Sequence, residues 1–175
     1  MKILTQYIKT PVGELILGSY NNQLCLADWR YRKMRKAIDA RIKKGLDTDY
    51  QEGNSAVLTE TEKQLNSYFL GDRTTFEIPL LLVGTDFQKK VWKSLLEVPY
   101  GKTNTYMGLS TILGDVKAIR AVATANGANA ISIIVPCHRI IGSNGDLVGY
   151  AGGLPAKKKL LELENPLRKS QMKMF

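Results

Sequence analysis

Histidine and cysteine are the scarcest reactive residues of this 175-residue chain, which contains one histidine and two cysteines. Two cysteines are too few for a disulfide framework, and they predict free thiols in a reducing compartment. No stretch approaches the ~18 consecutive apolar residues of a membrane span, and the opening MKILTQYIKTPVGELIL lacks the apolar core of a secretory leader. The composition therefore predicts a cytoplasmic globular protein.

Acidic residues are too few to balance the basic ones, and the net charge of +9 is unevenly distributed. Residues 1–84 carry a net charge of +2, whereas residues 85–175 carry +7. A polyanion such as DNA would therefore be expected to dock on the C-terminal half. A basic surface that only maintains solubility would explain the charge equally well.

The N-terminal half has the pattern of a small sheet with two helices. Three strand-like runs are separated by turn signals at Pro11-Val12-Gly13 and Asn21-Asn22. Amphipathic spacing predicts helices over 31–44 and 57–70, with a polar loop between them and a short strand over 74–78. The three strand-like runs are Lys2–Ile8, Glu14–Tyr20 and Gln23–Trp29.

A change of pattern after Gly84 predicts a second domain. Thr85-Asp86-Phe87-Gln88 has the spacing of a helix capping box, and Thr105 and Asp115 can each cap a short helix. Two short helices joined by a turn at Gly114 form a helix-turn-helix, which docks on DNA but also occurs as an ordinary helical hairpin. The predicted helices are 85–96, 106–113, 116–126 and 155–164.

The second helix of this pair is rich in alanine, and its only long cations are Lys117 and Arg120. A helix that reads base edges would carry Asn, Gln or several Arg. Small side chains instead allow the backbone of a helix to come close to a partner surface. That approach suits either sequence-indifferent contact with the DNA minor groove or tight packing inside the protein.

The run Ile131–Ile141 (ISIIVPCHRII) places a thiol, an imidazole and a guanidinium inside an apolar sequence. Unpartnered polar groups are costly to bury, so such a sequence usually builds a site. Cys137 is a strong nucleophile only as thiolate, and His138, the sole histidine, has the unperturbed pKa suited to take its proton. We expect a bridging water between them. A packed cysteine beside a structural histidine is the alternative.

Glu164 is the candidate for the group that orients the His138 ring. It ends the helix predicted over 155–164. A carboxylate at a helix C-terminus opposes the helix dipole at a cost of ~0.3–1 kcal/mol. A partner such as His138 would offset this cost, and a frayed, solvated helix end is the alternative.

From Ile134 to Ile141 the sequence resembles the O6-alkylguanine-DNA alkyltransferases, closely over 85–165 and loosely before that. The resemblance implies an α+β fold. A small N-terminal sheet-and-helix domain (1–80) would precede a helical, winged-helix-turn-helix-like domain (85–175) that carries the active-site cysteine. Further matching motifs are Thr105-Tyr106, Arg120-Ala121-Val122, Ala125–Asn129, Gly149–Gly153 and Lys157…Leu161…Glu164.

The resemblance also implies catalytic roles. Cys137 would accept the alkyl group, and a water-linked relay of His138 and Glu164 would make it a thiolate. Asn129 would brace the turn beside the site, and Tyr106 would donate a hydrogen bond to the departing guanine. The alkylated nucleotide would have to flip out of the duplex, because a stacked base cannot reach a buried thiol.

Contacts to DNA or the flipped base are implied in the same way. Arg120 would fill the space that the flipped nucleotide leaves, and Tyr150 would form a pocket wall with the small residues after it. Lys157 would support that loop or its electrostatics. The full implied set is Arg120, Arg139, Ile140, Tyr150, Ala151, Gly152 and Lys157.

The implied reaction is irreversible and occurs once per molecule, because a thioether has no ready leaving group. The substrates would be O6-alkylguanine and O4-methylthymine in double-stranded DNA, and the protein would act as a monomer without a cofactor. Some members hold zinc in the N-terminal domain, but here only Cys25 is available there, so we expect no metal. Two departures from the family pattern are Ala130, where many members have proline, and Met107-Gly108, which replaces a glutamine pair.

Three other functions remain open at this point. A non-catalytic relative that binds alkylated DNA would keep the helix-turn-helix but lack the cysteine. A transcription regulator would need sequence readout, which the alanine-rich helix does not favour. A hydrolase based on Cys137 and His138 would turn over repeatedly.

Overall fold

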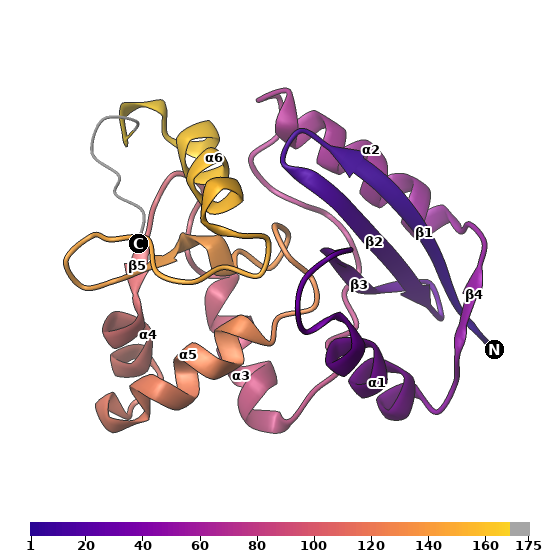
Figure 1. Ribbon diagram of the computed structural model, residues 1–175, viewed down its shortest axis with the longest axis horizontal. Helices are drawn as coiled ribbons and strands as arrows, with labels where there is room; N and C mark the ends of the chain where they lie inside the picture. Colours follow the sequence, from indigo (N-terminus) through magenta and orange to yellow (C-terminus); the bar gives the residue numbers. More distant parts are fainter. Residues whose placement is uncertain (169–175) are drawn as a thin grey trace. The chain divides into compact units, whose positions relative to one another are not determined.

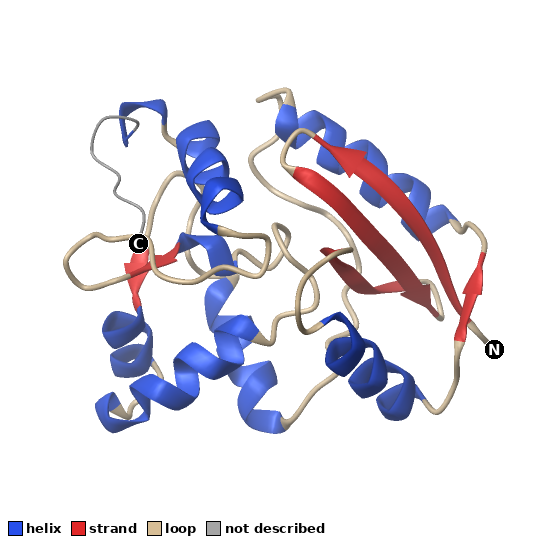
Figure 2. Ribbon diagram, in the orientation of Figure 1, coloured by secondary structure: helices blue, strands red, loops and turns tan. Residues whose placement is uncertain are grey.

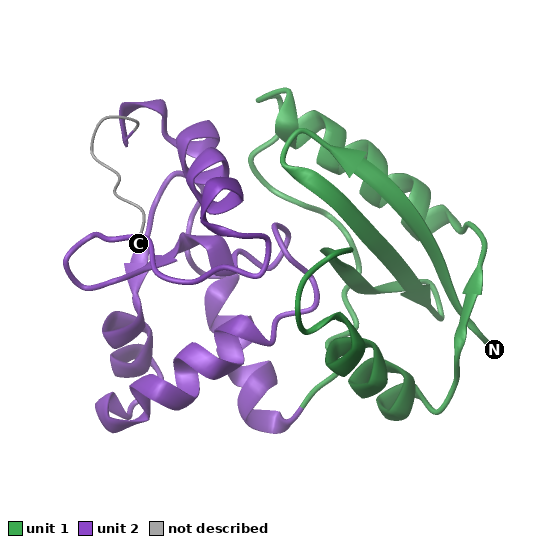
Figure 3. Ribbon diagram, viewed as in Figure 1, with its two compact units in different colours: residues 1–84 green, residues 85–175 purple. Residues whose placement is uncertain are grey.

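The computed structural model describes residues 1–168, and the chain forms two compact units, residues 1–84 and residues 85–175 (Figures 1 and 3). Unit 1 contains a four-stranded sheet and two helices, and unit 2 is mainly helical (Figure 2). The predicted α+β fold is therefore confirmed.

The sheet of unit 1 is a meander of three antiparallel strands with a short fourth strand at its edge. Its order is β3-β2-β1-β4, and β4 runs parallel to β1. Asn21 and Asn22 have φ values of +50° and +59°, the left-handed conformation that a tight hairpin turn requires. The strands are β1 (Ile3–Thr10), β2 (Gly13–Tyr20), β3 (Gln23–Trp29) and β4 (Tyr50–Glu52).

Two amphipathic helices, α1 (Arg35–Leu46) and α2 (Ala56–Phe69), bury their apolar faces within unit 1. Ile38 and Ile42, four residues apart on α1, are buried, which fits the amphipathic spacing of this segment. Residues 31–34, however, precede the helix, and half-exposed Met34 is its N-cap. Figure 1 shows α2 lying along the sheet.

Two further expectations for unit 1 were wrong. The segment predicted as a polar loop contains β4, which pairs with β1. Within the described chain, residues 74–78 form no strand, because the side chain of Gln64 bonds both the amide and the carbonyl of Glu77 in place of a strand partner. Leu80 alone forms an isolated bridge, with Leu24.

Unit 2 begins with the predicted capping box. The Thr85 hydroxyl accepts a hydrogen bond from the Gln88 amide, and Oε1 of Gln88 accepts one from the Thr85 amide. The Thr105 hydroxyl caps the next helix by accepting from the Gly108 amide, without a reciprocal bond. Asp115 caps only a 3-10 turn, after which the second α-helix of the pair begins. The helices are α3 (Asp86–Leu95), α4 (Tyr106–Ile112), η1 (Val116–Ala118), α5 (Ile119–Gly127), α6 (Leu154–Glu164) and η3 (Pro166–Arg168).

A parallel pair of two-residue strands, β5 (Asn104–Thr105) and β6 (Ile140–Ile141), joins distant parts of unit 2. Because α4 starts directly after β5 and the Cys137–Arg139 turn ends directly before β6, this pairing brings the start of α4 beside the candidate nucleophile. Trp92 on α3 is buried, and its indole donates to the Ala125 carbonyl at 2.8 Å, which fixes α5 to the core.

No helix in the part of the chain that the structure describes is both long and apolar enough to cross a membrane.

Candidate active site

Cys137 begins a short 3-10 helix, η2 (Cys137–Arg139), after a braced turn. Nδ2 of Asn129 donates to the carbonyls of Val135 at 2.8 Å and Ile131 at 3.3 Å, and its Oδ1 accepts from the Ile131 amide. Buried Ile133 has a φ of +71°, a conformation that a β-branched residue keeps only where its surroundings fix it. The turn therefore holds the cysteine in a defined place.

The single histidine is fully buried and is bonded to the carboxylate at the end of α6. Nε2 of His138 lies 2.7 Å from Oε1 of Glu164. Because an ionised carboxylate only accepts hydrogen bonds, Nε2 carries the hydrogen and Nδ1 carries the lone pair. Nδ1 is buried and has no hydrogen-bond partner among the described residues. It can therefore accept a proton.

Burial and charge set the protonation states of this pair. Burial lowers the pKa of His138 below its ordinary value, although the neighbouring Glu164 acts in the opposite direction. Burial by itself would raise the pKa of Glu164, but the contacts with His138 and Arg139 outweigh it and lower that pKa to about 2. At neutral pH the imidazole is therefore an uncharged base supported by a carboxylate.

Arg139 completes this cluster from inside the protein, and its expected contact with DNA stays a prediction. Its Nε and Nη2 donate to the two carboxylate oxygens of Glu164, both at 2.9 Å, and its Nη1 donates to the Val98 carbonyl at 2.7 Å. The guanidinium is buried and all three nitrogens are engaged. It is the counterion of Glu164.

Lys157 is also buried, and its contacts fit the expected support of the loop, whereas a direct contact with DNA stays a prediction. Its ammonium donates to the carbonyls of Ile140 at 2.6 Å, Gly149 at 3.2 Å and Val148 at 3.3 Å. Burial lowers the pKa of Lys157 to about 8, against the opposing effect of a charged Cys137. The Ile140 side chain is likewise fully buried, and its expected contact with DNA or the base stays a prediction.

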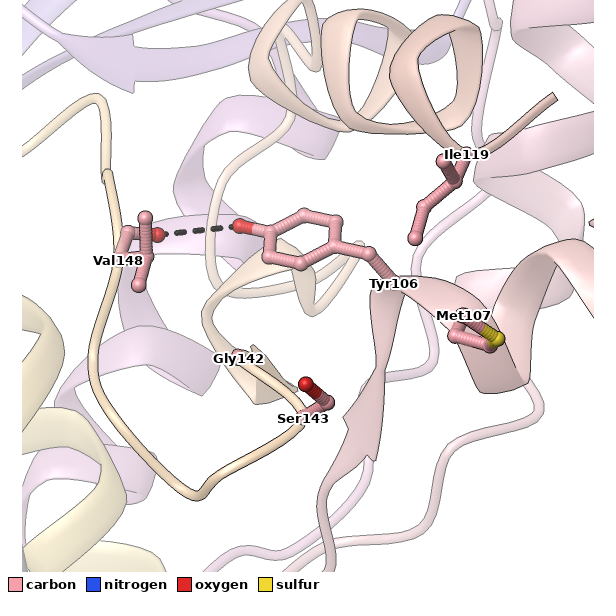
Figure 4. Close-up of a pocket in the computed structure, with 6 residues that line it drawn as sticks. All are labelled: Tyr106, Met107, Ile119, Gly142, Ser143 and Val148. Atoms are coloured by element: carbon pink, nitrogen blue, oxygen red, sulfur yellow. Dashed lines mark hydrogen bonds between the residues drawn. The ribbon is translucent and has the colours of Figure 1, made fainter. Parts of the chain in front are cut away.

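Tyr106, the first residue of α4, reaches across to the loop that follows β6. Its hydroxyl donates to the Val148 carbonyl at 3.1 Å (Figure 4). Burial raises the pKa of Tyr106, and the charge of Cys137 raises it further, so the side chain is an uncharged donor near the thiol. A cavity of about 230 Å³ adjoins the ring, and it is lined by Tyr106, Met107, Ile119, Gly142, Ser143 and Val148.

The remaining residues predicted for the site are Tyr150, Ala151, Gly152 and Arg120. The ring of Tyr150 meets that of His138 edge-on, with 6.5 Å between the centroids. Ala151 and Gly152 are half-buried in the turn that leads into α6. Arg120 is exposed near the start of α5, and the other exposed positions of that helix carry only small side chains.

The geometry thus brings Cys137, His138, Glu164, Asn129 and Tyr106 into one region of unit 2. Sequence reasoning missed that Arg139 pairs with Glu164 and that the Val148 carbonyl binds Tyr106. The first had a signal, because a guanidinium inside an apolar run needs a buried counterion. The second had none, because a backbone carbonyl leaves no mark in the sequence.

The fold and the site define a two-unit protein with a buried cysteine, a histidine–glutamate pair and a helix-turn-helix. Unit 2 matches the family model for the DNA-binding domain of 6-O-methylguanine DNA methyltransferase over residues 86–166. Unit 1 matches the model for the ribonuclease-like domain of the same enzyme over residues 3–82. The chain therefore belongs to the 6-O-methylguanine DNA methyltransferase family.

Individual relatives agree along nearly the whole chain. A methylated-DNA–protein-cysteine methyltransferase of Methanosarcina barkeri is 44% identical over 162 residues, which are 92% of this chain and 97% of the relative. One of Mycolicibacterium paratuberculosis is 46% identical over 96% of both chains. The crystal structure of Mycobacterium tuberculosis OGT in complex with DNA is 39% identical, covers 97% of this chain and 94% of its own, and has a TM-score of 0.80.

Proposed function

We propose that this protein repairs DNA by moving an alkyl group from O6 of guanine to Sγ of its own Cys137, once per molecule. The observation that carries the proposal is the buried His138–Glu164 pair beside Cys137, in a chain that belongs to an alkyltransferase family. A structural cysteine would not need a neutral imidazole whose Nδ1 is left to accept a proton.

The reaction begins with transfer of the Cys137 proton to Nδ1 of His138 through a water molecule. Glu164 stabilises the imidazolium that forms, because it accepts the Nε2 hydrogen at 2.7 Å. The thiolate attacks the alkyl carbon, a C–S bond forms, and the bond between that carbon and O6 breaks with its electron pair moving to guanine. The Tyr106 hydroxyl donates to a ring nitrogen as this charge develops.

DNA reaches the site through the helix-turn-helix of α4 and α5. Exposed Arg120 enters the duplex and takes the place of the flipped nucleotide, while its small neighbours let α5 approach the minor groove closely. The net charge of +7 on residues 85–175 adds affinity that does not depend on sequence. Tyr150 and the small residues Ala151 and Gly152 form a wall of the base pocket.

The proposal extends to substrate range, assembly and location. O4-methylthymine is a second substrate, because its methyl group is bonded to a comparable ring oxygen. The protein acts as a monomer, since all the proposed reacting groups come from one unit of one chain. It works in a reducing cytoplasm, where both cysteines stay free thiols.

Transfer of a radiolabelled methyl group from O6-methylguanine in a duplex to the protein tests this function. The wild type should become labelled and Cys137→Ser should not, although the variant should still bind the duplex. Cys25→Ser is the matched control, because Cys25 lies in unit 1 and burial raises its pKa to about 12. Tight binding by the wild type without any transfer would instead indicate a non-catalytic relative that binds alkylated DNA.

A further inference from the structure

One carbonyl in the loop after β6 accepts hydrogen bonds from two side chains of the site. Residues 142–149 form this loop. The Val148 carbonyl accepts from Tyr106 at 3.1 Å (Figure 4), and it also accepts from Lys157 at 3.3 Å. Lys157 also binds the carbonyls of Ile140 and Gly149. The ammonium therefore ties strand β6, at Ile140, to the end of the loop. Tyr106 instead attaches the loop to a different helix, α4.

The thiol is closed off in this arrangement. Cys137 is only 4% exposed, and it is not one of the six residues that line the cavity next to Tyr106. A charge on Cys137 would raise the pKa of both Tyr106 and Lys157, so the two side chains that hold the loop lie within electrostatic reach of the sulfur. A base cannot reach that sulfur until part of this surrounding structure moves.

Tyr106 cannot hold the loop and assist the reaction at the same time. A phenol has a single hydrogen to donate, and in the closed state the Val148 carbonyl accepts it. The function proposed above requires the same hydrogen for the guanine ring. The incoming base and the Val148 carbonyl therefore compete for one donor.

We propose that residues 142–149 are a lid over the acceptor thiol, that the Tyr106–Val148 hydrogen bond is its latch, and that the incoming base opens the lid by taking the tyrosine hydrogen. The proposal rests on the alkyl-transfer function, because the base must need this hydroxyl. Gly145 and Gly149 have φ values of +88° and +62°, which few other residues adopt, so they let the loop turn sharply at both positions. Lys157 remains as the tether in both states.

The latch is tested without DNA by the rate at which iodoacetamide modifies Cys137, followed by mass spectrometry of the peptide that contains it. Tyr106→Phe should raise this rate about three- to tenfold, because it removes one net hydrogen bond from the closed state. The tyrosine hydrogen is bonded to the Val148 carbonyl and not to the sulfur, so an increase in the rate reports opening of the loop. Thr111→Val is the matched control, since it removes a hydroxyl-to-carbonyl bond from the same helix, α4, without touching the loop.

A second variant and a second measurement make the test independent of one substitution. Gly149→Ala leaves Tyr106 intact but strains the closed lid at its positive φ, and it should raise the iodoacetamide rate as well. In Tyr106→Phe, amide hydrogens of residues 142–149 should exchange faster than in the wild type, while those of α3 should not change. Circular dichroism checks that each variant is folded.

The two proposals fail in different ways. If the wild type transfers methyl groups from DNA but neither variant changes the iodoacetamide rate or the hydrogen exchange, the lid is overturned and the function stands. If the wild type transfers nothing, the function fails whatever the loop does. Faster modification together with slower transfer from DNA in Tyr106→Phe supports both.

Discussion

At the scale of single residues, the site depends on how one carboxylate is shared. Glu164 binds the imidazole of His138 through Oε1 and the guanidinium of Arg139 through both oxygens. The guanidinium neutralises the carboxylate, so the imidazole can remain uncharged until it receives a proton. An arginine directly after the reactive Cys-His pair thus supports the proton relay from inside the protein.

Removal of this carboxylate should destabilise the protein. Glu164→Gln leaves the Arg139 guanidinium buried without its counterion, and we expect a loss of about 3–5 kcal/mol in the free energy of unfolding. Urea denaturation at pH 7 measures it. Glu162→Gln on the same helix is the control, because Glu162 is partly exposed and its ion pair with Lys158 is long, at 3.9 Å, so the change should be below ~1 kcal/mol. Equal losses in both variants would contradict the buried pair.

Low pH should remove the stability that the ionised Glu164 carboxylate contributes to the fold. The folded-state pKa of Glu164 is about 2, below its ordinary value of 4.5. The contact therefore stabilises the fold fully above pH 4.5, and this stabilisation is lost as the pH falls toward 2. The free-energy difference between wild type and Glu164→Gln should shrink by about 3 kcal/mol over that interval, as measured by urea denaturation at each pH. A difference independent of pH would mean that Glu164 is not held ionised.

His138→Ala should slow alkyl transfer while DNA binding persists. Loss of a positioned proton acceptor typically costs about 10²–10⁴-fold in rate, and His138 is too deeply buried to contact the duplex. Single-turnover transfer and gel-shift binding, measured on the same protein, separate the two effects. Wild-type transfer by this variant would exclude the relay.

The sequence was sufficient to predict the His138–Glu164 contact, because the only imidazole and a carboxylate at a helix end each needed a partner. It was not sufficient to identify the buried partners of Arg139 and Lys157. Basic side chains usually lie in solvent. Only the fold reveals that the Glu164 oxygens bind Arg139 and that three backbone carbonyls bind Lys157.

At the scale of elements, local capping signals were the most informative. Thr85 and Gln88 form the predicted box, since both hydrogen bonds depend on neighbours in the chain. The strand expected over 74–78 does not form, because its hydrogen bonds depend on a residue that is not a neighbour in the chain. The backbone groups of Glu77, within that segment, are bonded by the side chain of Gln64, 13 residues earlier in the chain. Tertiary partners of this kind cannot be read from local propensity.

Helix α5 should act on DNA through one side chain. Arg120 is exposed, so Arg120→Ala should leave stability within about 0.5 kcal/mol but slow transfer from duplex DNA. It should slow transfer from a free O6-alkylguanine base much less, because no stacked base has to be displaced. Lys93→Ala, an exposed cation on α3, is the control. Equal slowing with both substrates would show that Arg120 does not assist flipping.

At the scale of the whole molecule, charge and shape should govern DNA binding more than sequence. The excess charge lies in residues 85–175, and α5 exposes few groups that could read bases. Affinities for unrelated duplexes of equal length should therefore agree within about threefold and fall steeply with salt. Gel-shift competition measures this. A strong preference for one sequence would favour a transcription regulator.

The two-part organisation was visible in the sequence because the pattern changes after Gly84, where charge and helix signals both shift. The lid was not visible, because it depends on the carbonyl of Val148 and on the distance from Tyr106 to a loop about forty residues away. Chemistry carried by side chains was thus largely predictable, whereas contacts made by the backbone required the structure.

The central claim, that Cys137 accepts the alkyl group once and keeps it, is tested most directly by mass spectrometry of the intact protein and its peptides. The protein would be incubated with a large excess of duplex containing O6-methylguanine. We predict one added methyl group per chain, located on Cys137, and one repaired guanine per protein molecule. Repair of many guanines by each molecule, or a methyl group on any other residue, would contradict the account.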